Sequence, residues 1–558
     1  MSGGFPMNFD QKIAQAVRQA VKDAFDLDAE ENVLTIDTPK DPKLGDYASS
    51  AAMKLARALH QAPLAIAEAL APRLEALLPE AESVTVAKPG FLNFRMKKDA
   101  FTAVINQVLS AGDDYGKNQS VTGRKALVEW VSANPTGDLH CGHARNAAWG
   151  DAICRLMEAS GWEVLREFYV NDAGNQIVML GKSLEARYFE HFGRTDFELP
   201  ENGYHAEDVK QIAAQIAETE GDKWLTADPR ERLEHFMAVG KALELEKIDR
   251  DLKLYRVTMQ SWMHETSFYE NDMAPIRAVL DRMAELGLTY EKDGALWFRS
   301  SQYGDEKDRV LRKSDGTLAY LTPDIANHVH KVERGYPYLV DLWGADHHSY
   351  VIRMQAALTA LGYPKGTLNV DLIQMVRMVE DGKEVKMSKR TGNAITIREL
   401  CEDIGVDAAR WFFASKDVST HMDLDLKLAR SQDNNNPVYY AQYAHSRMCS
   451  ILSNPKMPAF HPEESYGRLT DEKELQLLKL IGEFPGFVGE CAALRKPNKL
   501  ADWILAFVKV FHSYYNSTKV YNPEDPELTN HRLGLIQATR ITLKNALALL
   551  AVSAPESM

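Results

Sequence analysis

The chain has 558 residues, of which 45% are hydrophobic and 26% are charged, and this composition and length predict a globular protein of about three to five domains. The formal net charge of −14 argues against loose, sequence-independent binding of nucleic acid, which favours a basic surface, but leaves open a local basic groove. Five cysteines without a CxxC pair predict reduced thiols rather than a disulfide framework. We find neither a signal peptide nor an apolar run of about 18 residues that would span a membrane, so we expect a cytoplasmic protein.

The first part of the chain, residues 1–118, is predicted to form an α+β domain. Apolar residues recur every four positions in "FDQKIAQAVRQAVKDAF", as in an amphipathic helix, at Ile13, Val17, Val21 and Phe25. "GDYASSAAMKLARAL" and "PLAIAEALAPRLEALL" predict two more helices, and "VTVAKPGFLNFRM" predicts two strands joined at a Pro-Gly turn. The polar stretch "SAGDDYGKNQSVTGRK" that follows is typical of a linker.

From Lys125 the pattern changes to alternating strands and helices. "KALVEWVSA" is a short apolar run typical of a buried parallel strand. The turn residues of "NPTGDLHCGH" follow, and "ARNAAWGDAICRLMEASG" then has helical composition with Gly161 as its predicted C-cap. "YPYLVDLWG" and "ADHHSYVIRMQAALTALG" repeat this order. The alternation predicts an α/β domain with a parallel sheet over residues 119–370, including an insertion.

The remainder of the chain is predicted to be a small connecting region followed by helices. "LIQMVRMVEDGKEVKMS" contains two strand-like runs about Asp381-Gly382, a strong hairpin signal. After about residue 395 the sequence is helical in character almost to its end. We therefore expect a connecting region at 371–430 and an all-α domain at 431–558.

Two histidines, His140 and His143, flank Gly142 in the turn between the first of these strands and its helix. A zinc site would need four ligands, and no second Cys/His pair has a suitable spacing, although folding could bring His347 and His348 near. A phosphate site fits the carboxyl end of a parallel sheet, where a helix N-terminus offers free N–H groups, Gly142 admits a nucleotide and imidazoles donate to oxygens. Ordinary surface histidines at a helix start are the third interpretation.

The stretch "KMSKRTGN", from Lys386 to Asn393, places two lysines and an arginine among small, turn-forming residues directly after the predicted hairpin. Ammonium groups on such a loop suit a pyrophosphate leaving group, because negative charge develops on it during displacement at the α-phosphate. A solvated basic loop is the alternative interpretation.

Together, HxGH on an early strand–helix turn and KMSKR far downstream resemble the paired signatures of class I aminoacyl-tRNA synthetases. Nucleotidylyltransferases with the same type of fold also carry HxGH, but they are usually much shorter and lack a long helical C-terminal region. A catalytically dead RNA-binding protein is opposed by the completeness of both motifs. The resemblance to arginyl-tRNA synthetases covers nearly the whole chain, in order, at "GDYASSAAMKLAR", "VEWVSANPTGDLHCGHARNAAWGD", "REFYVNDAGNQI", "DGTLAYLTPDIANHVHK", "LWGADHHSYVIRMQAAL", "SKDVSTHMDLDLKLA", "NNNPVYYAQYAHSR" and "LALLAVSAPESM".

This resemblance implies a Rossmann-type catalytic core and a two-step ligase. Arginine's carboxylate attacks the α-phosphate of ATP to form arginyl-adenylate and pyrophosphate, and the terminal ribose 2′-OH of tRNA(Arg) then attacks the activated carbonyl. Mg²⁺ is expected to accompany ATP, held by phosphate oxygens and water, with no protein metal ligand and no structural zinc. The residues expected at ATP are His140, Gly142, His143, Lys386, Met387, Ser388 and Lys389, with His140, His143, Lys386 and Lys389 catalytic.

For L-arginine, the resemblance implies a pocket that holds the planar, always charged guanidinium with carboxylates. The expected residues are Glu129, Ser132, Asn134, Tyr320, Asp324 and His347. Tyr320 and Asp324 are four apart, so one helical turn would put both on one face. The alternative for Asp324 is a helix N-cap or first-turn acid.

For tRNA(Arg), we expect the all-α domain to bind the anticodon and the N-terminal domain to touch the outer corner. Four residues of "NPVYYAQYAHSR" supply aromatic faces and one cation for stacking unpaired bases: Tyr439, Tyr440, Tyr443 and Arg447. Some of these tyrosines are expected to be core residues. The resemblance also implies a monomer.

Three residues depart from the pattern of the family. Asp138 stands where proline is common, Cys141 where an aliphatic residue is usual, and Ser557 where arginine is usual. A carboxylate two residues before His140 could weaken triphosphate binding or orient the imidazole. Ser557 leaves open any anticodon contact from that position.

Overall fold

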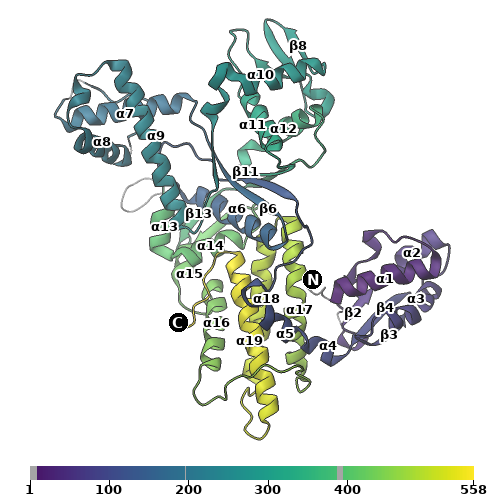
Figure 1. The fold of residues 1–558 in the computed structure, drawn as a ribbon. Coiled ribbons are helices and arrows are strands. Elements are labelled where there is room, and N and C mark those ends of the chain that lie inside the picture. The colour runs from purple at the N-terminus through teal and green to yellow at the C-terminus, as the bar shows by residue number, and fades with distance from the viewer. Residues whose placement is uncertain (1–8, 40, 195–196, 206, 386–393) are drawn as a thin grey trace.

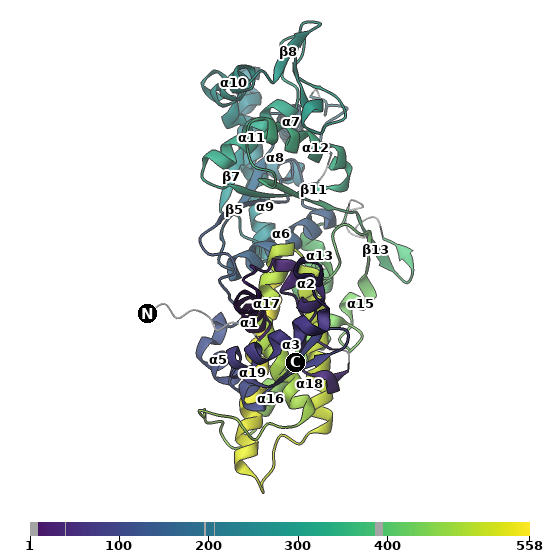
Figure 2. The ribbon, with the colours of Figure 1, turned by 90° about the vertical axis from the view of Figure 1, so that its right-hand side faces the viewer.

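The structure is a computed structural model in which residues 9–39, 41–194, 197–205, 207–385 and 394–558 are described. The N-terminal domain stands beside a group of long C-terminal helices, and the parallel sheet lies beyond them with two lobes attached (Figure 1). Figure 2 shows the lobes, the sheet and the C-terminal helices following one another along the long axis. The multidomain fold class predicted from the sequence is confirmed.

The N-terminal domain packs three helices against a four-stranded antiparallel sheet of order β1-β2-β4-β3. Its elements are α1 (Phe9–Phe25), β1 (Ile36–Asp37), β2 (Tyr47–Ser49), α2 (Ala51–Leu59), α3 (Pro63–Leu77), β3 (Ala81–Ala87) and β4 (Phe91–Met96). The predicted apolar stripe of α1 faces the core, with Ile13, Val17 and Val21 fully buried. One expectation was wrong in part, because Tyr47–Ser49 pairs with β4 as a strand and the helix begins only at Ala51.

The predicted linker is held by tertiary contacts. It follows two short helices, α4 (Lys98–Thr102) and α5 (Val104–Ala111). The Tyr115 hydroxyl donates to the Ile481 carbonyl at 2.7 Å, and the Asn118 side chain donates to the Pro485 carbonyl at 3.0 Å. This segment therefore lies against a C-terminal helix, and polar composition did not reveal that contact.

The central domain is built on a five-stranded parallel sheet of order β12-β11-β5-β6-β7. The strands are β5 (Lys125–Glu129), β6 (Glu163–Val170), β7 (Ser261–His264), β11 (Tyr338–Gly344) and β12 (Leu368–Ile373). Chain order runs outward from β5 on one side and from β11 on the other. The switch point between these neighbours is where open α/β sheets bind ligands, beyond the carboxyl ends of the strands.

Alternate residues of β5 pack into different cores on the two faces of the sheet. Ala126 and Val128 belong to the core that contains α6 (Cys141–Ala159), whereas Leu127 belongs to the core that contains α11 (Leu321–Glu333) and α12 (His348–Ala360). Because side chains alternate along a strand, Glu129 faces α11. The predicted order of strand, turn and helix is confirmed here.

Two lobes extend from this sheet (Figure 1). One is helical and contains the residues inserted between β6 and β7; the other combines helices with a small antiparallel sheet of order β10-β9-β8. Their elements are α7 (Asn175–His191), α8 (Glu207–Glu220), α9 (Pro229–Leu254), α10 (Glu270–Glu285), β8 (Thr289–Lys292), β9 (Ala295–Phe298) and β10 (Arg309–Arg312).

The connecting region forms the predicted hairpin, in which β13 (Val376–Glu380) pairs antiparallel with β14 (Lys383–Glu384). Asp381 and Gly382 both have positive φ, 49° and 75°, as a type I′ hairpin turn requires. A short strand within the region expected to be helical, β15 (Met422–Asp425), pairs parallel with β13. The helices of the region are α13 (Ile397–Ile404), α14 (Val406–Ala414) and α15 (Leu426–Arg430).

The C-terminal part is all-α, as predicted, and ends in four long helices. These are α16 (Pro437–Leu452), α17 (Glu472–Leu494), α18 (Pro497–Ser517) and α19 (Pro526–Leu549). Helix α6 of the central domain packs against α17, α18 and α19, so the first helix after β5 joins the sheet to the C-terminal helices.

We predict that Gly150→Ala destabilises the central domain by about 1–3 kcal/mol, because overpacking a filled core forces its neighbours to shift. A Cβ at Gly150, within α6, would lie 2.5 Å from Cγ of the fully buried Trp130. Urea-induced unfolding measures the effect. The control is Gly482→Ala in α17, where the nearest atom would be 3.8 Å away, and we expect no loss there. Equal midpoints for the two variants would contradict the prediction.

Candidate active site

The His140–His143 turn lies at the carboxyl edge of the parallel sheet, after β5. His140 is the N-cap of α6, and its Nδ1 accepts the Gly142 amide at 3.1 Å. His143 Nδ1 accepts the His140 amide at 3.2 Å, and the two rings stack with centroids 3.9 Å apart. Since each Nδ1 is an acceptor, the proton of each neutral ring lies on Nε2. The turn therefore presents two Nε2–H donors.

Partial loss of hydration keeps both imidazoles neutral, although His143 is only half-buried and His140 is exposed. It lowers the pKa of His140, and together with the neighbouring His140 ring it lowers the pKa of His143 to about 3. Protonation would disrupt the turn, because a protonated Nδ1 could no longer accept a backbone N–H. These rings can thus donate hydrogen bonds to phosphate oxygens without carrying a full charge.

Gly142 has a packing role that the sequence did not reveal. A Cβ at this position would lie 2.9 Å from Cε1 of His140, so any larger residue would displace the capping ring. The expectation of free N–H groups at this helix start was wrong for two amides: Cys141 donates to the Ile395 carbonyl at 3.0 Å, and Gly142 donates to His140.

The turn is also tied to the chain that follows the KMSKR stretch. Thr396 forms a bridge with His140 and caps α13, and the Ile397 amide donates to the Leu139 carbonyl at 2.8 Å. Residues from 394 onward are thereby held next to HxGH. Lys386, Met387, Ser388 and Lys389 lie outside the described residues, so their predicted contact with ATP stays a prediction.

The unusual Asp138 is paired with a lysine of the inserted segment. Lys247 of α9 places Nζ 3.1 Å from Asp138 Oδ1, 2.6 Å from Asp208 Oδ2 and 2.7 Å from Glu244 Oε2. Burial raises the pKa of Glu244 to about 7. This ammonium offsets the charge of Asp138, so the carboxylate is accommodated beside the histidine turn.

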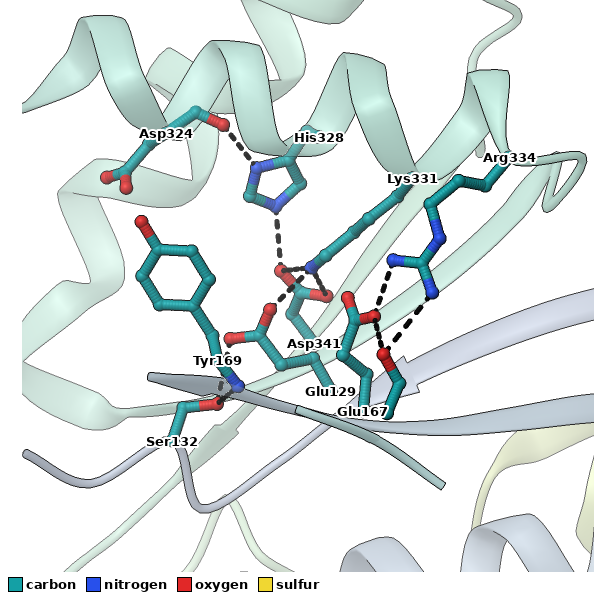
Figure 3. Close-up of polar contacts among 10 residues, drawn as sticks. Glu129, Ser132, Glu167, Tyr169, Asp324, His328, Lys331, Arg334 and Asp341 are labelled. Carbon is teal, nitrogen blue, oxygen red and sulfur yellow. Dashed lines mark hydrogen bonds and ion pairs between the residues drawn. The ribbon is translucent and has the colours of Figure 1, made fainter. Parts of the chain in front are cut away.

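Glu129, at the end of β5, belongs to a buried group of charges (Figure 3). Its Oε2 lies 2.6 Å from Nζ of Lys331, which is fully buried on α11. The same Nζ lies 3.2 Å from Oδ1 of Asp341 in β11. Burial raises the pKa of Glu129, against the opposing effect of Lys331. One ammonium of α11 is therefore shared by Glu129 and Asp341.

The other expected arginine contacts lie at the start of α11, directly after β11 and directly after β5. Asp324 is in the first turn of α11 and accepts a hydrogen bond from the Tyr350 hydroxyl; burial raises its pKa. Tyr320 is the N-cap residue of α11 and is 90% exposed, whereas Asp324 is half-buried, so the expected turn is present but the two residues differ in burial. His347 is exposed, with Nε2 3.5 Å from Oδ2 of Asp346.

Ser132 and Asn134 follow β5 in a strained turn. Val131 and Ser132 have φ of 66° and 40°, a conformation that costs a β-branched residue such as valine of the order of 1–3 kcal/mol. The Ser132 hydroxyl donates to Glu129 Oε1 at 3.0 Å and accepts the Tyr169 amide at 3.1 Å. Residues with strained backbone cluster at binding and active sites.

Sequence reasoning missed Lys331, Asp341, His328 and the Tyr169 hydroxyl, a buried atom with no hydrogen-bond partner among the described residues. One signal was available for Asp341, which interrupts the apolar run "YPYLVDLWG". A carboxylate in a buried parallel strand needs a cation beside it. The sequence could not say which cation, because Lys331 and its neighbours in α11 have the composition of an ordinary polar helix face.

The predicted aromatic stretch forms a cluster on α16 and α18. Tyr439 and Tyr443 stack with centroids 6.2 Å apart, and the Arg447 guanidinium lies 4.9 Å from the rings of both Tyr443 and Tyr515. Tyr440 packs instead against His512, with centroids 4.9 Å apart. All four predicted residues are half-buried. Ser557 is exposed. It follows Pro555 and Glu556, whose backbone carbonyls accept hydrogen bonds from side chains of α16.

Within the described ranges, no three or more His, Cys, Asp or Glu residues are grouped in a way that could hold a metal ion. Over the same residues, no helix combines the length and the apolar character that crossing a membrane requires.

Three family models match consecutive parts of the chain. Residues 11–96 match the arginyl-tRNA synthetase N-terminal domain, residues 104–448 the catalytic domain of class I tRNA synthetases (R), and residues 441–558 the DALR anticodon-binding domain.

Whole-length relatives agree with these matches. The arginine–tRNA ligase of Oceanobacillus iheyensis is 46% identical over 98% of this chain and 99% of its own. That of Bacillus subtilis is 46% identical over 99% of this chain and all of its own. The structure of Thermus thermophilus arginyl-tRNA synthetase superposes with a TM-score of 0.76, at 22% identity, over 99% of this chain and 100% of that one, which supports the fold.

We predict that His143→Gln reduces the loss of stability that the protein undergoes between pH 7 and pH 5. The folded pKa of His143, about 3, lies below its unfolded value of about 6.5. The unfolded state therefore binds the extra proton, and stability falls as the pH drops below that unfolded value. We expect this residue to account for about 1–2 kcal/mol of the loss. Urea unfolding at both pH values measures it.

The matched control is His60→Gln, at the exposed end of α2, which should keep the full wild-type loss. If His143→Gln lost as much stability as the wild-type protein, its burial as a neutral acceptor would be contradicted.

Proposed function

Because the chain belongs to the arginyl-tRNA synthetase family, we propose that it ligates L-arginine to tRNA(Arg) through arginyl-adenylate, with ATP converted to AMP and pyrophosphate. The observation that carries the site assignment is a juxtaposition at one edge of the sheet. The two Nε2–H donors of the histidine turn follow the same strand, β5, that ends in Glu129. A triphosphate and a cationic amino acid can therefore meet beyond that edge.

In the first step, His140 and His143 bind the phosphates through Nε2–H, and the positive end of the α6 dipole favours the charge that develops there. Lys386 and Lys389, with Met387 and Ser388 between them, are proposed to hold the β- and γ-phosphates. Mg²⁺ would be held by phosphate oxygens and water and would offset phosphate charge. No covalent enzyme intermediate is required, because charge stabilisation and positioning supply the acceleration.

Arginine is proposed to lie between the start of α11 and the turn after β5. Asp324 is the carboxylate best suited to the guanidinium, because its known partner, Tyr350, occupies only part of its hydrogen-bonding capacity. Both oxygens of Glu129 already have partners. Glu129 therefore contributes negative charge and a remaining acceptor site, and it does not offer the guanidinium a bidentate contact. Ser132, Asn134, Tyr320 and His347 are proposed to orient the rest of the substrate.

For the second step, tRNA(Arg) is proposed to contact three parts of the chain. The aromatic cluster of α16 and α18 would stack anticodon bases, residues 1–118 would touch the outer corner, and residues 371–430, which include the KMSKR stretch, would contact the tRNA stem. We further propose a cytoplasmic monomer in which adenylate formation requires bound tRNA, as in the family that the sequence resembles.

We predict that ATP–pyrophosphate exchange occurs with arginine, and only when tRNA is present. The assay is run with each amino acid, with and without tRNA. Exchange without tRNA, or exchange favouring another amino acid, would contradict the proposal and favour a nucleotidylyltransferase that no longer charges tRNA. Complete absence of exchange would favour an RNA-binding protein without catalysis.

We predict that Asp324→Ala lowers kcat/KM for arginine at least tenfold, about 1.4 kcal/mol of transition-state stabilisation, because the guanidinium loses its carboxylate partner. Steady-state aminoacylation with varied arginine measures it. Asp315→Ala, in an exposed turn before α11, serves as the control and should change little. An unaltered kcat/KM in Asp324→Ala would leave Asp324 as a first-turn acid of α11 only.

A further inference from the structure

Three carboxylates stand side by side across the middle of the parallel sheet. Asp341 of β11 is the Cα partner of Glu129 in β5, and Glu129 is the Cα partner of Glu167 in β6. All three side chains point to the face that α11 covers (Figure 3). Adjacent like charges in buried strands repel one another, so this row requires cations from outside the sheet.

Helix α11 and its C-cap residue, Arg334, supply two cations, and each contacts different carboxylates of the row. Lys331 contacts Glu129 and Asp341. Arg334 places Nη1 2.6 Å from Glu167 Oε2 and also donates a hydrogen bond to the Ser261 hydroxyl of β7. Lys331 is fully buried, and the Arg334 side chain is 24% exposed. The two residues are one helical turn apart, which makes them a natural pair for comparison.

From Lys331, one chain of contacts leads back to Asp324. Asp341 Oδ2 lies 2.7 Å from Nε2 of His328, and Nδ1 of His328 lies 2.7 Å from the Asp324 carbonyl. A carbonyl can only accept, so His328 Nδ1 carries a proton and donates it. The ring thereby links the buried charges to the backbone of the residue proposed to hold the guanidinium.

A second chain of contacts leads from Lys331 to the strained turn. Glu129 receives the ammonium on Oε2 and the Ser132 hydroxyl on Oε1. Ser132 has a positive φ and stands two residues before Asn134. The same ammonium thus supports both segments that are proposed to contact arginine, without being exposed to substrate itself.

We propose that Lys331 is a positioning residue for arginine recognition, acting through Glu129 on the turn at Ser132 and Asn134 and through Asp341 and His328 on Asp324. The inference rests on the proposed function, because it takes these segments to be the arginine site. Arg334, which neutralises Glu167 alone, is assigned a structural role. The two cations of α11 therefore differ in function although they lie in the same interface.

The electrostatics of the row give the inference a pH signature. Burial works to raise the pKa of Asp341, but Lys331 and His328 lower it to about 2. Burial raises the pKa of Glu129, and Lys331 opposes this. Without Lys331 the Glu129 pKa rises further, so Glu129 takes up a proton as the pH falls and its negative charge beside arginine is lost. The other titratable or charged groups that face this centre are Asp324, His328 and the Glu167–Arg334 pair.

The experiment compares Lys331→Met with Arg334→Met in the full chain, by aminoacylation kinetics from pH 6 to pH 9. We expect Lys331→Met to raise KM for arginine at least tenfold and to leave KM for ATP within about twofold. Its pH profile should also gain an acidic limb, that is, a fall in kcat/KM for arginine as the pH decreases. In the double variant Lys331→Met/Glu129→Gln that limb should disappear, because the titrating carboxyl is gone. Arg334→Met should lower stability while changing KM for arginine less than threefold.

If Lys331→Met does not fold, His328→Phe gives the second test, because it removes the contacts of His328 to Asp341 and Asp324 and leaves Lys331 paired with Glu129 and Asp341. It should raise KM for arginine and not KM for ATP. The proposal is overturned if arginine and ATP constants change together, if Arg334→Met has the same effect as Lys331→Met, or if neither Lys331→Met nor His328→Phe alters KM for arginine. Wild-type exchange with arginine is measured in parallel, and its absence would contradict the proposed function rather than the role of Lys331.

Discussion

The row of Asp341, Glu129 and Glu167 across three adjacent strands is the constraint on which the central domain depends. The parallel sheet can bury these carboxylates only if a helix brings cations to the same face. Helix α11 does so with Lys331 and Arg334, which sets its rotation about its own axis. Once that rotation is set, Asp324 and His328, on the same side of the helix, must lie over the carboxyl end of β5.

The opposite face of the sheet is organised by buried arginines instead. Arg145 of α6 is fully buried and donates to the carbonyls of Gln374, Asp417 and Thr420, at 2.8, 2.8 and 3.0 Å. Those carbonyls border β13 and β15, so the helix that begins at the histidine turn also holds the sheet that precedes KMSKR. A second pair, Asp151 and Arg410 at 2.6 Å, joins α6 to α14. Buried cations thus organise both faces of the sheet.

Much of the fold follows from short-range pattern. The four-residue stripe of α1, the Asp381-Gly382 hairpin and the apolar run of β5 depend on residues that are neighbours in the chain, and each was predicted. The strand at Tyr47–Ser49 was not, because its partner β4 lies some distance along the sequence and alanine-rich context favours helix. The linker around Tyr115 was mistaken for a free connection because polar composition carries no information about its docking on α17.

For the site, the sequence by itself determined the chemical groups: two histidines about a glycine, a basic stretch downstream, and carboxylates suited to a guanidinium. It also determined that the histidine turn joins a buried strand to a helix. Only the tertiary structure decided how those groups are charged and held. Glu129 and Lys331 are 202 positions apart, and Asp138 meets Lys247 from an inserted helix. The physical reason is that the energy of a buried charge depends on the groups around it in space, and pattern in the chain records only neighbours along it.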